Sequence, residues 1–174
     1  MGSADVNPLT KVLLPINKVL AKVAPRQPNS VLANTMNKVL NSQLKDRTAT
    51  SKFAWLSENT ANIEAYEADP KTGFDFTNNG FMTLFTLMDT GLNKGWAITI
   101  AKNFPMLFIS GEDDPIGNMG RGIRRVVKRL HKQKFNHVDI QLYPNMRHEV
   151  LHETDNQTVY QDILAWIKST TPDA

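Results

Sequence analysis

Three side chains near the end of the sequence have the types and spacing of a zinc protease motif. His148, Glu149 and His152 spell H-E-x-x-H within the stretch NMRHEVLHE. In zinc proteases both His residues lie on one face of a helix and bind the metal, while the Glu serves as general base. A third protein ligand must come from another part of the chain. The motif therefore raises the question of whether this chain binds zinc.

The residues around the motif favour another interpretation. His148 follows LYPNMR, which reads as the end of a strand and a turn, so we expect it in a loop rather than within a helix. The longer pattern H-E-x-x-H-x-x-G-x-x-H also fails, because Asp155 stands where Gly is needed. The sequence thus predicts no metal site, and His152 is expected to be an exposed residue of a loop or of a first helical turn.

A second combination joins His148 to an acidic residue earlier in the chain. Asp114 lies in SGEDDP, and both SGEDDP and YPNMRHE follow short runs that read as strands. In open parallel sheets, chemistry gathers at the carboxyl ends of the strands. A carboxylate and an imidazole placed there suit acyl transfer, since the acid orients the imidazole and the imidazole takes a proton from a nucleophile. Two simpler readings stay open: Asp114 can cap a helix or shape a turn before Pro115, and His148 can be a structural or surface residue.

Alternating strands and helices in the second half of the sequence would position these two residues. FPMLFISG and HVDIQLYP read as strands, and each is followed by a helix with one apolar face. The apolar positions are Ile123, Val126, Val127 and Leu130 in the first helix, and Val159, Ile163, Trp166 and Ile167 in the second. This βαβα order predicts an α/β fold with a parallel sheet. Two strands do not make a stable parallel sheet, so the unit looks like part of a larger α/β domain.

The first half of the sequence shows helical rather than strand-like spacing. Apolar residues predict helices on both sides of the loop PRQPNS, the first kinked or broken at Pro15 and the second capped by Asn29 or Ser30. A third helix is predicted from Ser57 to Asp69. A fourth carries an apolar stripe, which is expected to pack in the core or to line an acyl-chain channel: Phe81, Met82, Leu84, Phe85 and Met88.

Composition limits the cellular compartment and the kinds of partner expected for this chain. The chain has 174 residues, a net charge of +3 and no Cys, so disulfides are excluded and a reducing, cytoplasmic setting is expected. No apolar run is long enough to cross a membrane, and the N-terminus lacks the features of a secretory signal. Nucleic-acid binding is not expected, because aromatic residues are not interleaved with the basic ones. One basic set is expected to be the solvated side of a helix or to attract anionic lipid surfaces: Arg121, Arg124, Arg125, Lys128, Arg129, Lys132 and Lys134.

Four stretches of the sequence carry a resemblance to a known family. They are PMLFISGEDDPIGNMGRGIRRVVKRL, VDIQLYPNMRHEVLHE, VYQDILAWI and the loop YEADPKTGFDFT. Together they resemble the C-terminal part and the cap end of α/β-hydrolases of the lysophospholipase and monoacylglycerol lipase type, the serine aminopeptidase-like hydrolases. The resemblance implies a mainly helical cap in residues 1–78 and the C-terminal part of the hydrolase core in residues 79–174. It also implies that Asp114 is the catalytic acid, that His148 is the catalytic base and that no cofactor is needed.

The sequence departs from this family at the nucleophile. The family uses a G-x-S-x-G elbow in the N-terminal half of the fold, and none of the Ser residues here stands in that pattern. We therefore expect the catalytic Ser outside this chain, and either the N-terminal hydrolase half or a second copy of the chain as partner. The implied function is a serine hydrolase of carboxylic esters, with a single-acyl lipid ester such as a lysophospholipid or monoacylglycerol as substrate. The alternative is a truncated, non-catalytic hydrolase-like interaction module.

Overall fold

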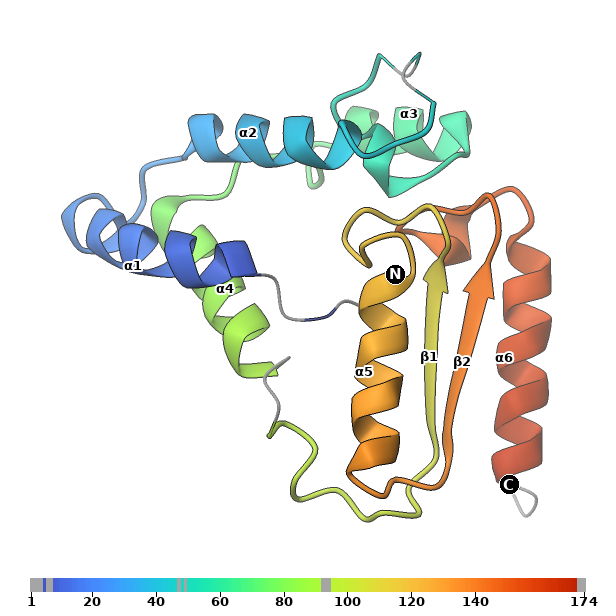
Figure 1. Cartoon of the computed structure of the whole chain (residues 1–174). Helices are drawn as coiled ribbons and strands as arrows, with labels where there is room; N and C mark the ends of the chain where they lie inside the picture. The colour runs from blue at the N-terminus through green and yellow to red at the C-terminus, as the bar shows by residue number, and fades with distance from the viewer. Residues whose placement is uncertain (1–4, 6–7, 47, 49, 92–94, 172–174) are drawn as a thin grey trace.

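The computed structural model describes residues 5, 8–46, 48, 50–91 and 95–171. Helices dominate the first half, and a strand–helix–strand–helix unit forms the second (Figure 1). The elements follow in this order: α1 (Pro8–Val23), α2 (Ser30–Asn41), the 3-10 turn η1 (Ala54–Leu56), α3 (Thr60–Ala68), α4 (Asn78–Gly91), β1 (Met106–Gly111), α5 (Arg121–Lys132), β2 (Val138–Tyr143), the 3-10 turn η2 (Val150–His152) and α6 (Asn156–Thr170).

Strands β1 and β2 lie side by side and run parallel, in register from Met106 opposite Val138 onward. Successive side chains point to opposite faces, as they do in any strand. Phe108 packs on the α5 side, whereas its neighbour Ile109 joins the cluster on the α6 side. The two helices therefore cover opposite faces of the sheet (Figure 1), and the α/β fold expected from the sequence is confirmed.

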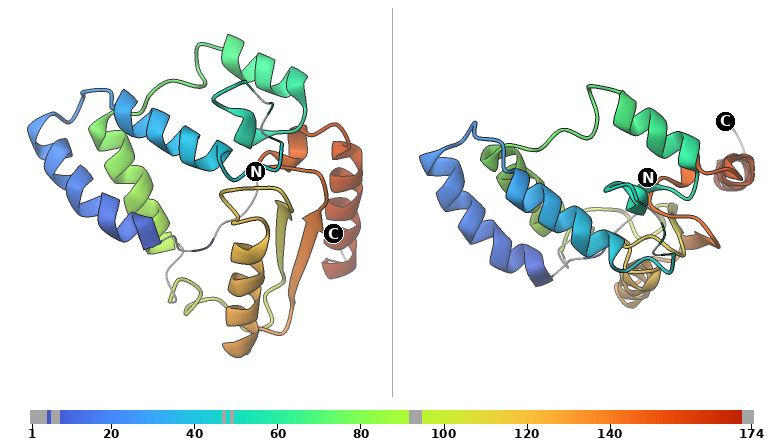
Figure 2. Two further views of the ribbon diagram at one scale, coloured as in Figure 1. Left: turned by 45° about the horizontal axis from the view of Figure 1, so that its top comes forward. Right: turned by 90° about the horizontal axis from the view of Figure 1, so that it is seen from above.

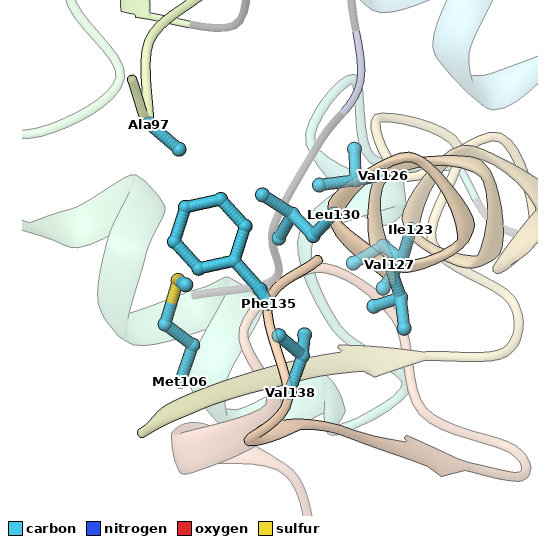
Figure 3. Packing of buried hydrophobic residues seen from close by; sticks show 8 residues of the cluster. All are labelled: Ala97, Met106, Ile123, Val126, Val127, Leu130, Phe135 and Val138. Carbon is cyan, nitrogen blue, oxygen red and sulfur yellow. The ribbon is translucent and has the colours of Figure 1, made fainter. Parts of the chain in front are cut away.

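The main hydrophobic core lies between α5 and the sheet. Figure 3 shows the Phe135 ring between Met106 of β1 and Leu130 of α5. Burying one large apolar side chain stabilises a fold by about 1.5–3 kcal/mol, so such a cluster fixes α5 firmly against both strands. The buried members are Ala97, Met106, Ile123, Val126, Val127, Leu130, Phe135 and Val138. This packing holds the ends of β1 and β2, and hence the loops that follow them.

The helices of the first half form a separate layer. α1 packs against α4, and this pair lies to one side of the sheet (Figures 1 and 2). α3 and the end of α2 lie over the edge toward which both strands point (Figure 1). The boundary predicted between residues 78 and 79 falls at the start of α4, and this division of the chain stays a prediction.

Two helix boundaries differ from those expected from the sequence. α1 packs against α4 and continues through Pro15 without the break that was one of the two expectations, while a kink at that residue stays a prediction. α3 begins after Asn59 rather than after Ser57: the Asn59 side chain accepts the backbone N–H of Ala61, whereas the Ser57 hydroxyl oxygen accepts the N–H of Asn59 just before the helix. The expected cap of α2 is confirmed, since the Asn29 side chain accepts a backbone hydrogen bond there.

Candidate active site

The loops after β1 and β2 bring Asp114 and His148 together. The Nδ1–H group of the His148 ring donates to Oδ2 of Asp114 over 3.0 Å. Asp114 is fully buried, whereas the His148 side chain keeps 14% of its surface exposed. Because the strands are parallel and in register, their carboxyl ends lie at one edge, where the two loops meet. The contact that the sequence predicted between these residues is present.

Gly111, the last residue of β1, lets the His148 loop cross the end of the strand. A Cβ atom at this position would lie 1.9 Å from the carbonyl oxygen of Met146, which no side chain tolerates. The backbone N–H of Asp113 donates to the same carbonyl over 3.0 Å. The two loops are thus joined backbone to backbone, and the close approach requires the missing side chain of Gly.

Asp114 is held by donors from its own loop. Its Oδ1 accepts the backbone N–H of Ile116 over 2.8 Å, and its backbone carbonyl accepts the N–H of Met119 over 2.9 Å. The buried Ser110 hydroxyl lies 3.3 Å from Oδ2, the oxygen that also meets the imidazole. Asp114 therefore shapes the turn before α5, as the simpler reading predicted, and contacts the His148 ring at the same time.

The two other acidic residues of this loop have different partners. Asp113 pairs with the Lys45 ammonium at 2.6 Å, and this hydrogen bond raises the pKa of Lys45. Glu112 lies 3.6 Å from the Arg124 guanidinium of α5. Of the three neighbouring carboxylates, Asp114 is the one that meets His148.

Trp55, on η1, packs against the His148 ring from the helical layer. The two ring centroids lie 5.5 Å apart, with the planes inclined by 47°. The indole Nε1–H donates to Oδ1 of Asn37 over 2.8 Å, and the backbone N–H of Trp55 donates to Oδ1 of Asn41 over 2.9 Å. Sequence reasoning did not single out Trp55, because nothing in the spacing along the chain indicates that η1 lies over His148.

Four polar side chains form a second cluster next to His148: Ser57, Glu58, Arg147 and Glu153. The buried Arg147 guanidinium contacts the Glu58 carboxylate at 2.7 Å. Burial raises the pKa of Glu58, and the nearby Arg147 charge opposes that rise. Glu153 reads from the sequence as a first-turn residue of the last helix, and this interpretation is wrong: Glu153 lies before α6 and is buried.

The zinc interpretation of HEVLH does not match the local structure. η2 begins at Val150, so His148 lies in the preceding loop and does not share a helix with His152. The His152 side chain is 61% exposed, and its Nδ1 lies 3.7 Å from the Glu149 carboxylate. Over the ranges that the structure describes, no three His, Asp or Glu side chains gather closely enough to hold a metal ion.

The apolar stripe of α4 divides between core packing and partial exposure. Phe81 and Phe85 are buried, with ring centroids 5.9 Å apart. Phe76 adds a ring 5.6 Å from that of Phe81. The remaining members of the stripe are half-buried, and an acyl-chain channel along them stays a prediction.

The chain matches a known family and is similar to several solved structures. A family model described as serine aminopeptidase, S33, matches residues 4–155. A thermostable carboxyl esterase from Bacillus coagulans, in complex with glycerol, is similar with a TM-score of 0.85 and 21% identity, over 97% of this chain and 55% of the esterase. A soluble monoglyceride lipase variant from Saccharomyces cerevisiae, in complex with a substrate analog, gives a TM-score of 0.60 and 21% identity, over 94% and 52% of the two chains. A monoacylglycerol lipase from Paleococcus ferrophilus gives 0.57 and 21%, over 84% and 55%.

These likenesses extend over almost all of this chain but only part of the others. The chain spans about half the length of the three solved structures. Comparison with curated protein sequences gave no match. At this level of identity, the structural likeness shows a shared fold.

Proposed function

This chain belongs to the serine aminopeptidase (S33) family, and we propose that it carries the acid and the base of a serine hydrolase acting on carboxylic esters. The α/β-hydrolase resemblance expected from the sequence is confirmed. The observation that carries the proposal is the 3.0 Å contact between His148 and Asp114 at the ends of two parallel strands. In α/β-hydrolases the triad follows the order Ser, acid, His along the chain, and these two residues fit the last two places.

The proposed chemistry divides between two residues of this chain and a Ser outside it. Asp114 holds the tautomer of His148 that carries its proton on Nδ1, so Nε2 has the lone pair that accepts a proton. Nε2 takes the proton of the Ser hydroxyl as its oxygen attacks the ester carbonyl, and then gives it to the leaving alcohol. Water repeats these steps on the acyl-enzyme and releases the carboxylic acid. Throughout, the Asp114 carboxylate stabilises the imidazolium form.

We assign the nucleophile to an N-terminal hydrolase half, because no Ser of this chain stands in G-x-S-x-G. In the part of the chain that the structure describes, β1 has β2 as its sheet neighbour. A parallel sheet this short is ordinarily part of a larger one. The N-terminal half is the proposed partner that completes it, and pairing with a second copy of this chain is the other candidate.

The proposed substrate is a single-acyl lipid ester, such as a monoacylglycerol or a lysophospholipid. Two of the similar solved structures are monoglyceride or monoacylglycerol lipases, which supports this class of ester. The half-buried apolar side chains of α4 are the proposed wall for the acyl chain, because an aliphatic chain is stabilised by leaving water. They are Met82, Leu84 and Met88.

Weak association with an anionic membrane surface forms part of the proposal. Along the described part of the chain, no helix has the length and apolar character that crossing a membrane requires. On α5, Arg125 and Arg129 bind the Asp5 carboxylate. We assign the surface contact to Lys128 and Lys132, whose charges would attract anionic lipids and would be screened by salt.

Reconstitution tests the proposed function. The chain is joined to the N-terminal half of an S33 hydrolase that carries G-x-S-x-G, and hydrolysis of a short-acyl nitrophenyl ester is measured together with fluorophosphonate labelling. The chain alone is expected to be inactive, and the assembled protein is expected to hydrolyse the ester. His148→Ala should then lower kcat by roughly 10⁴- to 10⁶-fold, since the general base is removed.

His152→Ala is the matched control, because His152 follows His148 closely in the chain and is largely exposed. It should leave kcat within about twofold of the unmodified protein, as expected for a surface side chain. Undiminished hydrolysis in His148→Ala would contradict the proposal. If no assembled form hydrolyses esters or takes the label, the non-catalytic interaction module becomes the better account.

A further inference from the structure

We infer that Glu153 is a positioning residue, whose buried carboxylate fastens the loop that carries His148 to the segment that carries Trp55. This inference rests on the proposed function, in which the His148 ring is the general base. Glu153 does not touch that ring. It acts by binding backbone next to His148 and backbone shortly after Trp55, the two residues whose rings are in contact.

The Glu153 carboxylate is a hub that accepts hydrogen bonds from both segments. From the His148 loop, the backbone N–H of Arg147 donates to Oε1 over 2.7 Å. From the Trp55 side, the Ser57 hydroxyl donates to Oε2 over 2.8 Å. The backbone N–H groups of Glu58 and Asn59 add donors at 3.0 Å and 3.2 Å from the same oxygen. With only 2% of its surface exposed, Glu153 relies on these protein donors rather than on water.

The chemistry of this hub requires a carboxylate. Each of the four partners supplies a proton, so the acidic side chain must present acceptor oxygens only. A Gln side chain would direct N–H groups at backbone N–H donors, which leaves buried donors without acceptors. Glu153→Gln hardly changes the size of the side chain. Its effect therefore reports lost hydrogen bonds rather than altered packing.

The donors lie immediately beside the two rings that meet. Arg147 precedes His148 in the chain, and Ser57 follows Trp55 by two positions. The connection is reinforced by the backbone N–H of Glu149, which donates to the carbonyl of Leu56 over 2.8 Å. Backbone on both sides of the imidazole is therefore tied to backbone that follows the indole, and the 5.5 Å ring separation depends on these ties.

The Arg147 side chain strengthens the same junction. Its Nη1 donates to the carbonyl oxygens of Ala54 and Ser57 over 2.7 Å and 3.1 Å. These carbonyls flank Trp55 in the chain. Arg147 thus binds the carbonyls of Ala54 and Ser57, while Glu153 binds the N–H groups of Glu58 and Asn59 that follow them.

The far side of the indole is fixed by α2. Asn37 accepts from the Trp55 indole and Asn41 accepts from its backbone N–H. The contacts therefore run from α2 through Trp55 to His148. Glu153 links the two ends of the last step, because it binds both the His148 loop and the residues after Trp55. Loss of Glu153 should loosen the indole and the imidazole relative to each other while leaving the α2 contacts in place.

Nuclear magnetic resonance of the full chain tests this role without any need for catalysis. Trp55→Leu first measures how far the indole ring current displaces the Hε1 resonance of His148. Glu153→Gln is expected to lose at least half of that displacement of the His148 Hε1 resonance. The resonances of His131 and His137, which lie far from Glu153 in the chain, serve as internal references and should stay in place.

Glu67→Gln is the matched control, because the exposed Glu67 carboxylate also accepts a Ser hydroxyl, that of Ser51 over 2.7 Å. It should leave the His148 resonances unchanged. Ser57→Ala removes one of the four donors and should move Hε1 in the same direction by less. If Glu153→Gln folds and the Hε1 resonance of His148 keeps its wild-type position, the inference is wrong. If Glu153→Gln does not fold, an unmoved His148 in Ser57→Ala overturns it equally, and neither result depends on whether the assembled protein cleaves esters.

Discussion

The strand–helix unit and the first two helices differ in how far their apolar side chains are buried. In α5, Ile123 and Leu130 are buried against the sheet. In α1, apolar side chains with the same helical spacing keep more than half of their surface exposed: Val12, Ile16, Val19 and Val23. The described residues of α2 include none that is buried. The two regions show similar periodic patterns, yet only one of them supplies its own core.

The buried face of α1 also differs from that of α5, because it carries polar side chains. Its buried residues among those described are the polar Thr10 and Asn17. Asn17 donates to the carbonyl of Leu13, while its own side-chain oxygen has no partner among the described residues. A buried, unpaired acceptor costs about 1–3 kcal/mol. Amphipathic spacing thus says which face of a helix is apolar, but the packing partner decides whether that face stabilises the fold.

The candidate site lies where these two regions meet. The strand–helix unit supplies Asp114 and His148, and the helical layer supplies Trp55. The strand–helix unit can hold the 3.0 Å contact between His148 and Asp114 steadily, whereas the described residues of α2, which hold Trp55 from its far side, include none that is buried. We therefore expect the Asp114–His148 contact to vary less than the contacts that α2 makes with Trp55.

Hydrogen exchange should show the largest contrast between the regions. Amides of β1, β2 and α5 are expected to exchange at least about 10³-fold more slowly than those of α1 and α2, because core elements open only with the whole fold. Mass spectrometry of the deuterated chain, digested into peptides, measures this ratio. Equal protection in the two regions would mean that α1 and α2 are stabilised by contacts of the same strength as α5.

A matched pair of truncations should separate the regions by several kcal/mol. Ile123→Ala removes a fully buried side chain and should lower the free energy of unfolding by about 2–5 kcal/mol. Ile16→Ala makes the same change on an exposed face and should alter it by about 0.5 kcal/mol or less. Urea unfolding of both variants measures the difference. Similar losses would show that the outer face of α1 is covered in solution.

Alkaline pH should weaken the strand–helix unit through Tyr143. Burial, helped by the Asp162 charge, raises the pKa of Tyr143 to about 12. The folded state therefore favours the neutral phenol, and this stabilisation is complete below about pH 10, the ordinary pKa of Tyr, and is lost as the pH rises toward 12. The loss amounts to at most about 2–3 kcal/mol. Tyr143→Phe should remove that part of the pH dependence in denaturation series, and an unchanged slope would show that the phenol is not sealed from water.

Local patterns in the sequence were enough to predict the half of the molecule that carries Asp114 and His148. The alternation in HVDIQLYP and the apolar face of RGIRRVVKRL specify a strand and a helix without reference to distant residues. Parallel strand ends share an edge, so an acidic residue of SGEDDP could be expected to meet His148 from topology, and the family resemblance implied Asp114 rather than its rivals Glu112 and Asp113. That contact is present at 3.0 Å, while its catalytic role stays a proposal.

The residues that sequence reasoning missed depend on contacts between segments far apart in the chain. Glu153 reaches Ser57, 96 positions earlier, and no periodicity records that approach. A Glu shortly before a helix is ordinarily explained by the helix dipole. Here four hydrogen-bond donors outweigh that effect, because a desolvated carboxylate gains more from direct hydrogen bonds than from an exposed position near a helix end.

The measurement that tests the central claim most directly is a double-mutant cycle on the assembled enzyme. Asp114→Asn, His148→Ala and the double variant are compared for kcat/KM on the same short-acyl ester. Asp114→Asn alone should cost roughly 10⁴-fold. If the carboxylate and imidazole act as one unit, the double variant should lose no more than His148→Ala alone, because the acid has nothing to orient once the ring is gone. Losses that multiply, so that Asp114→Asn costs as much without the imidazole as with it, would contradict the account.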